Sequence, residues 1–209
     1  MKGVNIKSYL KLGAGCFALL LGGCISLPSS PVSPTPRFYV LSAINQPEVS
    51  KKINVTPGRI IGVGPVKLPA YLDRPQIVTK DKEGMLKFDE FDRWGESLGL
   101  GIARLIREDL TAMLPQEKLT LYPWNPSIAV KYQVVAEVVQ LDSELDKNMF
   151  FAVQWMIIDV TNAKAVIIKR SEFRTAIMPQ DYTGIAKTLS AACASLSSQI
   201  AKALASLKG

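Results

Sequence analysis

Histidine is absent from the 209-residue sequence, and cysteine occurs only three times. Without histidine the chain has no Ser-His-Asp or Cys-His catalytic arrangement and no imidazole to bind a metal ion. The cysteines, Cys16, Cys24 and Cys193, are too few to form a disulfide framework, and two of them lie near one end of the chain. We therefore expect no cofactor, no metal site and no histidine-dependent enzyme.

A long hydrophobic run is also missing. The mostly apolar stretch 12–21 has about half of the roughly 20 residues that a membrane-spanning helix needs. It follows a basic start with three lysines and ends in small residues, which is typical of a secretory signal. The sequence therefore predicts a signal peptide over residues 1–23 rather than a transmembrane helix.

The end of this signal, Leu21-Gly22-Gly23-Cys24, resembles the bacterial lipobox. In such signals the chain is cut before the cysteine, which then carries acyl chains. Cys24 is the predicted lipidation site, because Cys16 has Gly13 where the lipobox has leucine. Three acyl chains would anchor the protein almost permanently, since each buried CH₂ contributes about 0.8 kcal/mol. The alternative is a plain secretory signal in which Cys24 is incidental.

The charge of the exported chain is modest. Removal of the signal takes away three lysines and lowers the formal charge from +7 to +4. A small positive excess suits an anionic lipid surface but also many ordinary domains, and it gives no reason to expect nucleic acid as a partner. Ile25 follows the lipobox cysteine instead of the aspartate that signals inner-membrane retention, which favours the outer membrane.

Residues 24–36 are predicted to form a lipidated tether. Four of the twelve residues from 25 to 36 are prolines, with serines between them, so neither helix nor sheet is expected. An extended polyproline-like chain at about 3.1 Å per residue would hold the following domain away from the membrane. A leader without a length requirement is the alternative.

Residues 37–209 read as a single α/β domain with a mixed sheet and at least two helices. Apolar side chains at three- and four-residue spacing predict two helices, and β-prone runs predict eight strands. Asp92 is the expected N-cap of the first helix. The strand 149–160 is apolar on both faces, so both faces should be covered. The helices are expected at 93–114 and 181–207, and the strands at 37–41, 59–66, 76–79, 85–88, 119–122, 129–141, 149–160 and 165–175.

Two motifs are weak signals of a binding or catalytic site. Asp89, Glu90 and Asp92 could bind a cation or act in acid–base catalysis, although acids at a helix start also serve capping and dipole roles. The glycine pairs Gly62-x-Gly64 and Gly99-x-Gly101 lack the remaining features of a phosphate loop. We expect the second pair to allow close helix packing.

The segment 66–78 is the most informative. Pro69 and Pro75 restrict the chain around an aromatic residue and an Asp-Arg pair, which predicts a structured loop. Its Leu-Pro-x-Tyr-Leu-Asp-Arg-Pro-Gln sequence resembles the PqiC-type ABC-transport auxiliary lipoproteins. The lipobox, Phe38-Tyr39-Val40-Leu41 and 61–66 are similar to the same family. So is Phe91-x-x-Trp94-Gly95-Glu96-x-Leu98, in which Gly95 replaces the usual alanine.

This resemblance implies a lipid-anchored protein at the periplasmic side of the outer membrane. It implies an MCE-domain periplasmic protein and an integral inner-membrane protein as partners, in a route for lipids that supports envelope integrity. It further implies a three-layer α/β/α sandwich and no enzymatic activity. A ring of several copies is an additional expectation, because the end of a tunnel suits a ring-shaped partner.

The candidate contacts with the MCE partner are aromatic and charged residues of the family segments, a composition that often dominates protein interfaces. Packing within the protein's own loop is the alternative role for them. Two other functions stay open: a structural or cell-wall-binding envelope lipoprotein, and a periplasmic lipoprotein hydrolase that uses Asp89, Glu90 or Asp92. The candidate contacts are Tyr71, Leu72, Asp73, Arg74 and Trp94.

Overall fold

The computed structural model describes residues 34–43, 51–53, 58–145 and 147–207. Contacts within the chain divide it into Met1–Pro34 and Thr35–Gly209, and the fold below is that of the second unit. The predicted signal peptide, Cys24 and most of the tether lie outside the described residues, as does Cys16. Those assignments therefore stay predictions.

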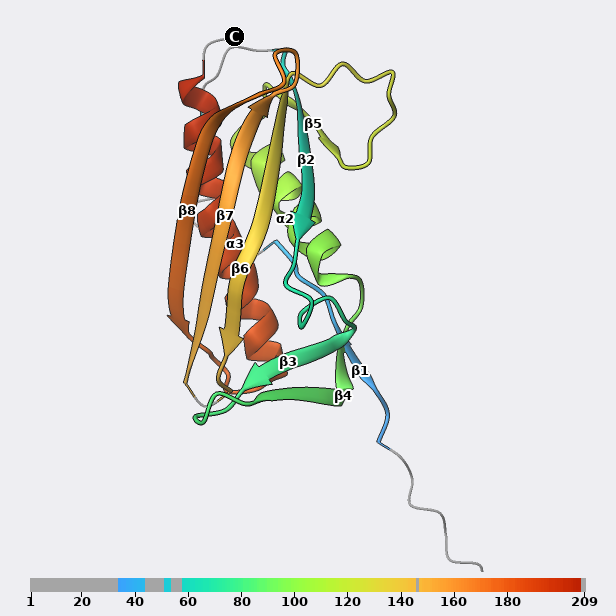
Figure 1. The fold of residues 1–209 in the computed structure, drawn as a ribbon, viewed down its shortest axis with the longest axis vertical. Helices are drawn as coiled ribbons and strands as arrows, with labels where there is room; N and C mark the ends of the chain where they lie inside the picture. Colours follow the sequence, from blue (N-terminus) through green and yellow to red (C-terminus); the bar gives the residue numbers. More distant parts are fainter. Residues whose placement is uncertain (1–33, 44–50, 54–57, 146, 208–209) are drawn as a thin grey trace, which may run out of the picture. The chain divides into compact units, whose positions relative to one another are not determined.

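The described residues form eight strands and two long helices, labelled in Figure 1. Their positions confirm the α/β class, the mixed sheet and the two main helices expected from the sequence. The strands are β1 (Arg37–Tyr39), β2 (Ile60–Lys67), β3 (Gln76–Lys80), β4 (Leu86–Trp94), β5 (Lys118–Leu121), β6 (Tyr132–Ser143), β7 (Asn148–Asp159) and β8 (Lys164–Ala176), and the helices are α2 (Leu98–Met113) and α3 (Tyr182–Ser206).

Five strands form the larger sheet in the order β5-β2-β6-β7-β8. β2 runs parallel to both β5 and β6, and β6, β7 and β8 form the antiparallel meander that their sequence predicts. Side chains alternate between the two faces along a strand, so every second residue of β7 points to the same face. The residues of the inner face are completely or almost completely buried: Phe151, Val153, Trp155 and Ile157. These side chains form the middle of the hydrophobic core.

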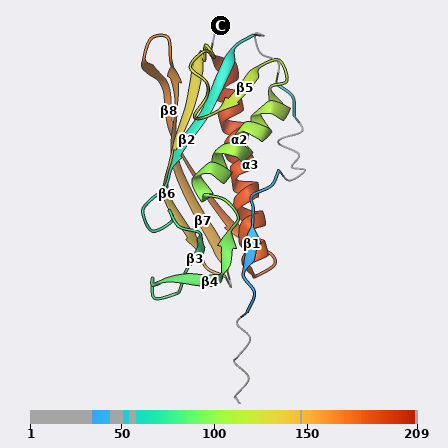
Figure 2. The ribbon, with the colours of Figure 1, turned by 90° about the vertical axis from the view of Figure 1, so that its right-hand side faces the viewer.

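Both helices cover the same face of this sheet (Figure 2). α2 contacts β2 and β5, α3 contacts β7 and β8, and the two helices also contact each other. On the opposite face Met156 and Ile158 are only half-buried, and Ile168 is 61% exposed. Within the described residues no helix covers this face, although the apolar outer face of β7 predicted that it would be covered.

A second sheet of three strands, β1-β4-β3, accounts for one difference from the sequence prediction. We expected a helix from residue 93, capped by Asp92. Instead, Arg93 and Trp94 belong to β4 and pair with Phe38 and Tyr39 of β1. The helix begins only at Leu98, after the N-cap Ser97. Strand pairing therefore overrides the helical pattern in the first turn.

The carboxyl end of α3 is fixed by a buried ion pair. Arg59, at the start of β2, pairs with Glu117 and also donates hydrogen bonds to the carbonyl oxygens of Leu204 and Leu207. Both charged side chains are almost fully buried. Arg59 thereby satisfies carbonyl groups that the end of a helix leaves without partners, and it joins α3 to the edge of the large sheet.

Asp109 is a buried acid at the contact between α2 and α3. Its Oδ2 accepts a hydrogen bond of 2.9 Å from Ser197 Oγ, whereas its buried Oδ1 has no partner. Burial raises the pKa of Asp109 to about 6. The same contact holds Cys193 as a fully buried free thiol, and burial raises the pKa of that thiol as well.

Replacing the acid should change how stability depends on pH. Folded Asp109 binds its proton more tightly than the unfolded chain does, so its favourable contribution is complete below about pH 4 and is lost as the pH rises through about 6. In the Asp109→Asn variant the free energy of unfolding should fall less as the pH rises. At pH 7 we expect this variant to be more stable than the wild type by on the order of 1–2 kcal/mol. Urea unfolding at several pH values measures both effects.

Glu83→Gln, in the exposed turn between β3 and β4, is the matched control and should keep the wild-type pH profile. An Asp109→Asn protein with the same pH profile as the wild type would show that the buried acid does not titrate in this range.

Candidate functional site

The segment Leu68–Pro75 leads from β2 to β3 and is held by backbone hydrogen bonds. Leu72 N donates to Pro69 O and Arg74 N donates to Leu72 O, both at 2.9 Å. The loop is then joined to β4, because Trp94 N donates to Pro75 O at 2.7 Å. The structured loop predicted from its two prolines is confirmed.

The five candidate contacts separate into core and surface. Leu72 and Trp94 are 3% and 6% exposed and belong to the hydrophobic core, so they support the loop and are not the surface contacts that we expected. Tyr71 is half-buried, and its Oη accepts a 3.4 Å hydrogen bond from Leu141 N of β6. Asp73 is exposed and Arg74 partly so. A partner would therefore meet mainly Asp73 and Arg74.

Arg74 is held over an aromatic ring. Its guanidinium carbon lies 4.1 Å from the centroid of the Phe88 ring of β4, an arrangement in which the cation is attracted by the face of the ring. Its Nε is buried and has no hydrogen-bond partner. The stacking fixes where the charge is presented and leaves hydrogen-bonding capacity unused.

Two hollows flank the loop where it meets the start of α2. One, of about 390 Å³, is lined by residues 73–75 and 94–98. The other, of about 340 Å³, is lined by 66–68, Asp73, Ser97, Gly99 and Leu100. Asp73 and Ser97 line both hollows, so the surface of the family segments is a pair of adjoining depressions with an exposed carboxylate between them.

The amino end of α2 adds a positive electrostatic contribution. Its first turn contains no acid, and the N-cap Ser97 makes no side-chain capping bond. Glu96 is turned away to Arg104, at 2.6 Å. The helix also approaches β2 closely, since a Cβ on Gly99 would lie 2.8 Å from Val66 O, and this confirms the packing role expected for that glycine. Charges of both signs thus stand beside apolar walls, as in a protein-binding surface.

Residues 39–201 match the family model of the ABC-type transport auxiliary lipoprotein component. The chain belongs to this family. No functionally curated protein matches the sequence.

Two solved structures share the fold of this chain, and a third is less similar. An uncharacterised protein is 16% identical with a TM-score of 0.66, covering 82% of this chain and 99% of its own. Protein XCC0632 from Xanthomonas campestris is 9% identical with a TM-score of 0.64, covering 82% and 95%. A PelC dodecamer from Paraburkholderia phytofirmans is 14% identical with a TM-score of 0.46, covering 76% and 96%.

The acids singled out in this auxiliary lipoprotein all bind neighbouring groups. Asp92 accepts hydrogen bonds from Arg37 at 2.6 Å and from Tyr39 Oη at 2.7 Å, and only 2% of its side chain is exposed. Asp89 accepts from two backbone N–H groups and from Tyr182 Oη, and Glu90 pairs with Arg93. The group binds β1 and the start of α3 to β4, contrary to the N-cap role expected for Asp92.

The pKa shifts in this cluster follow from the same contacts. Burial, followed by the hydrogen bond to Asp92, raises the pKa of Tyr39 to about 12. Burial would raise the pKa of Asp89, but hydrogen bonds from the backbone and from Tyr182 outweigh it and lower that pKa. Tyr39 therefore stays protonated and Asp89 ionised at neutral pH, which is the combination that these hydrogen bonds need.

One pattern that the sequence prediction missed is Gly95-Glu96-Ser97-Leu98-Gly99, which has the spacing of a nucleophile elbow between a strand and a helix. Ser97 has φ −53° and ψ 127°, an ordinary conformation rather than the strained turn of that motif. The sequence has no histidine to act as its base. The pattern here serves the turn into α2.

Within the described ranges, no group of three or more potential ligands could hold a metal ion. The helices in those ranges also include none that is long and apolar enough to cross a membrane.

Removing the carboxylate of Asp92 should loosen β1. Asp92→Ala leaves the Tyr39 hydroxyl and Arg37 without their shared partner, and we expect a loss of about 1–3 kcal/mol in the free energy of unfolding. Urea denaturation measures it. Glu90→Ala, two residues away and exposed, is the control and should change stability little. Equal stability of the two variants would contradict a structural role for Asp92.

Proposed function

We propose that this protein is an outer-membrane lipoprotein that docks onto the periplasmic tunnel protein of an MCE-type lipid transport system. Membership of the auxiliary lipoprotein family, shown by the match over residues 39–201, carries the transport-associated role. The predicted lipidation of Cys24 supplies the membrane anchor, and Ile25 favours the outer membrane. An integral inner-membrane protein completes the system.

The loop Leu68–Pro75 and the start of α2 form the proposed docking surface. Backbone hydrogen bonds hold the loop that carries Asp73 and Arg74, and stacking on Phe88 holds the Arg74 side chain. Binding a partner would therefore cost little conformational entropy at these two residues. The hollows beside them offer space for the partner's own side chains. Asp89 and Asp92 both accept hydrogen bonds that hold the protein's own segments together, which favours an adaptor over a hydrolase.

A ring of copies is part of this proposal. β8 is an edge strand of thirteen residues in the larger sheet, and Val166 and Ile168 on it are exposed. An edge of this kind has unpaired backbone groups that can pair with another chain. Several copies joined along it would suit the rim of a tunnel.

Docking is tested by the double substitution Asp73→Ala and Arg74→Ala in a co-purification with the MCE-domain protein. If these two side chains carry about 2 kcal/mol of the binding free energy, the dissociation constant rises roughly 30-fold. The control removes two other exposed charged side chains, Lys52 and Lys202, and should bind as the wild type does. Undiminished capture by the folded double variant contradicts this docking surface.

The cell-wall alternative is separated by crosslinking in intact cells. A photo-crosslinking residue at position 73 should capture the MCE-domain protein. Capture of peptidoglycan in its place would assign the protein to a structural role in the envelope.

A further inference from the structure

Five segments meet at one end of the domain, and of these only β4 and the β3–β4 hairpin are adjacent in the sequence (Figures 1 and 2). The start of β1 is bound to β4 through Arg37 and Asp92. The loop before α3 is held there because Tyr182, the first residue of α3, donates a hydrogen bond to Asp89 of β4. The same loop reaches the β6–β7 turn, because Ile177 N donates to Lys147 O at 3.0 Å. The β3–β4 hairpin joins them through the ion pair of Lys80 with Asp142.

Each of four of these segments exposes a large apolar side chain. Phe38 of β1 is 67% exposed, Met85 at the hairpin tip 63% and Met178 in the loop before α3 75%. Phe91, in β4, is 39% exposed. Apolar groups presented singly are common on protein surfaces, but four on neighbouring projecting segments indicate an interaction surface.

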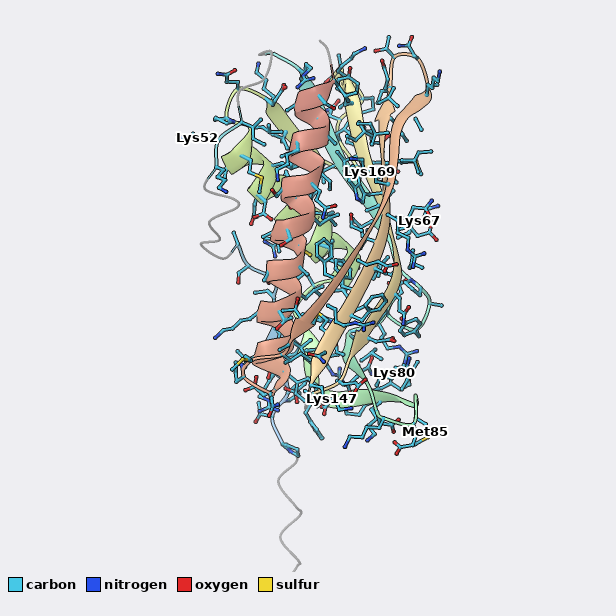
Figure 3. The ribbon with its side chains drawn as sticks, turned by 90° about the vertical axis from the view of Figure 1, so that its left-hand side faces the viewer. Lys52, Lys67, Lys80, Met85, Lys147 and Lys169 are labelled. Carbon is cyan, nitrogen blue, oxygen red and sulfur yellow. The ribbon has the colours of Figure 1, made fainter. Side chains whose placement is uncertain are left out.

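Charged side chains of both signs lie near Met85. Figure 3 shows Lys80, Lys147 and Met85 at this end, well separated from Lys169 on β8. The two labelled lysines are ion-paired, Lys80 with Asp142 and Lys147 with Glu144. Apolar tips beside paired charges suit the boundary between the acyl chains of a bilayer and its polar headgroups.

The place where the described chain begins indicates what this surface contacts. The described chain begins at Pro34 and enters β1 at the same end. Nine residues lie between Cys24 and Pro34, and the ten steps along the chain span at most about 36 Å. A bilayer that holds acyl chains on Cys24 is therefore within reach of this end.

We propose that this end of the domain rests on the membrane, with the side chains of Phe38, Met85, Phe91 and Met178 in the interfacial layer of a phospholipid bilayer. The inference rests on the proposed lipid anchor and adds to it a defined orientation of the domain. A tether alone would leave the orientation of the domain undefined, whereas contact at four tips fixes which face is turned away from the membrane.

The test uses the full lipidated protein in vesicles of phosphatidylethanolamine and phosphatidylglycerol. Met85→Cys and Met178→Cys each carry an environment-sensitive NBD label. Val160→Cys is the control, because Val160 is exposed in the turn between β7 and β8 at the opposite end of the domain. Cys193 is fully buried, and unmodified protein measures any background labelling. We expect a blue-shifted emission and several-fold stronger quenching by doxyl-labelled lipid at positions 85 and 178 than at 160.

The outcomes separate this inference from the proposed function. Equal quenching at all three positions, in protein that carries lipid and floats with the vesicles, overturns the membrane-facing end but leaves the anchor intact. A response at position 85 only when the MCE-domain protein is added assigns this end to a protein partner and also overturns the inference. Protein that carries no lipid and does not float refutes the anchor and the inference together.

Discussion

The attachment of β1 to β4 through the buried carboxylate of Asp92 is the constraint on which the rest of the domain depends. A strand of only three residues has too few backbone bonds to stay in place alone. Arg37 and Tyr39 both bind that carboxylate, and Leu41 then enters the core. Any force on an anchor ahead of residue 34 would reach the domain through this attachment.

Hydrogen bonds also connect β1, through β4, to the candidate docking surface. Gly95 N donates to Tyr39 O at 2.7 Å and Trp94 N donates to Pro75 O, so β4 holds β1 on one side and the end of the loop Leu68–Pro75 on the other. α2 begins immediately afterwards, and Arg104 on it donates to Leu41 O. The chain's point of entry and the Asp73–Arg74 pair thus belong to one rigid arrangement, as an adaptor between a membrane and a protein partner requires.

The sequence predicted those elements whose pattern is decided locally. The meander β6–β8 and α3 were predicted within a few residues, because alternating or helical apolar spacing reflects the face that each element buries. The three-stranded sheet was not predicted, because the sequence around Arg93 and Trp94 has a helical pattern and their pairing with β1 depends on residues distant in the sequence. The chemical character of the loop was visible in its prolines and charges, but only the fold shows that Leu72 and Trp94 face inward and that Phe88 supports Arg74. Burial of this kind depends on partners distant in sequence.

The central claim is that a lipid-anchored adaptor works from the membrane, and the state of its mature amino terminus tests that claim most directly. Mass spectrometry of protein purified from the membrane fraction should find Cys24 as the first residue, carrying acyl chains. A terminus at another residue, or an unmodified Cys24 in protein released with the soluble periplasmic fraction, would contradict the account.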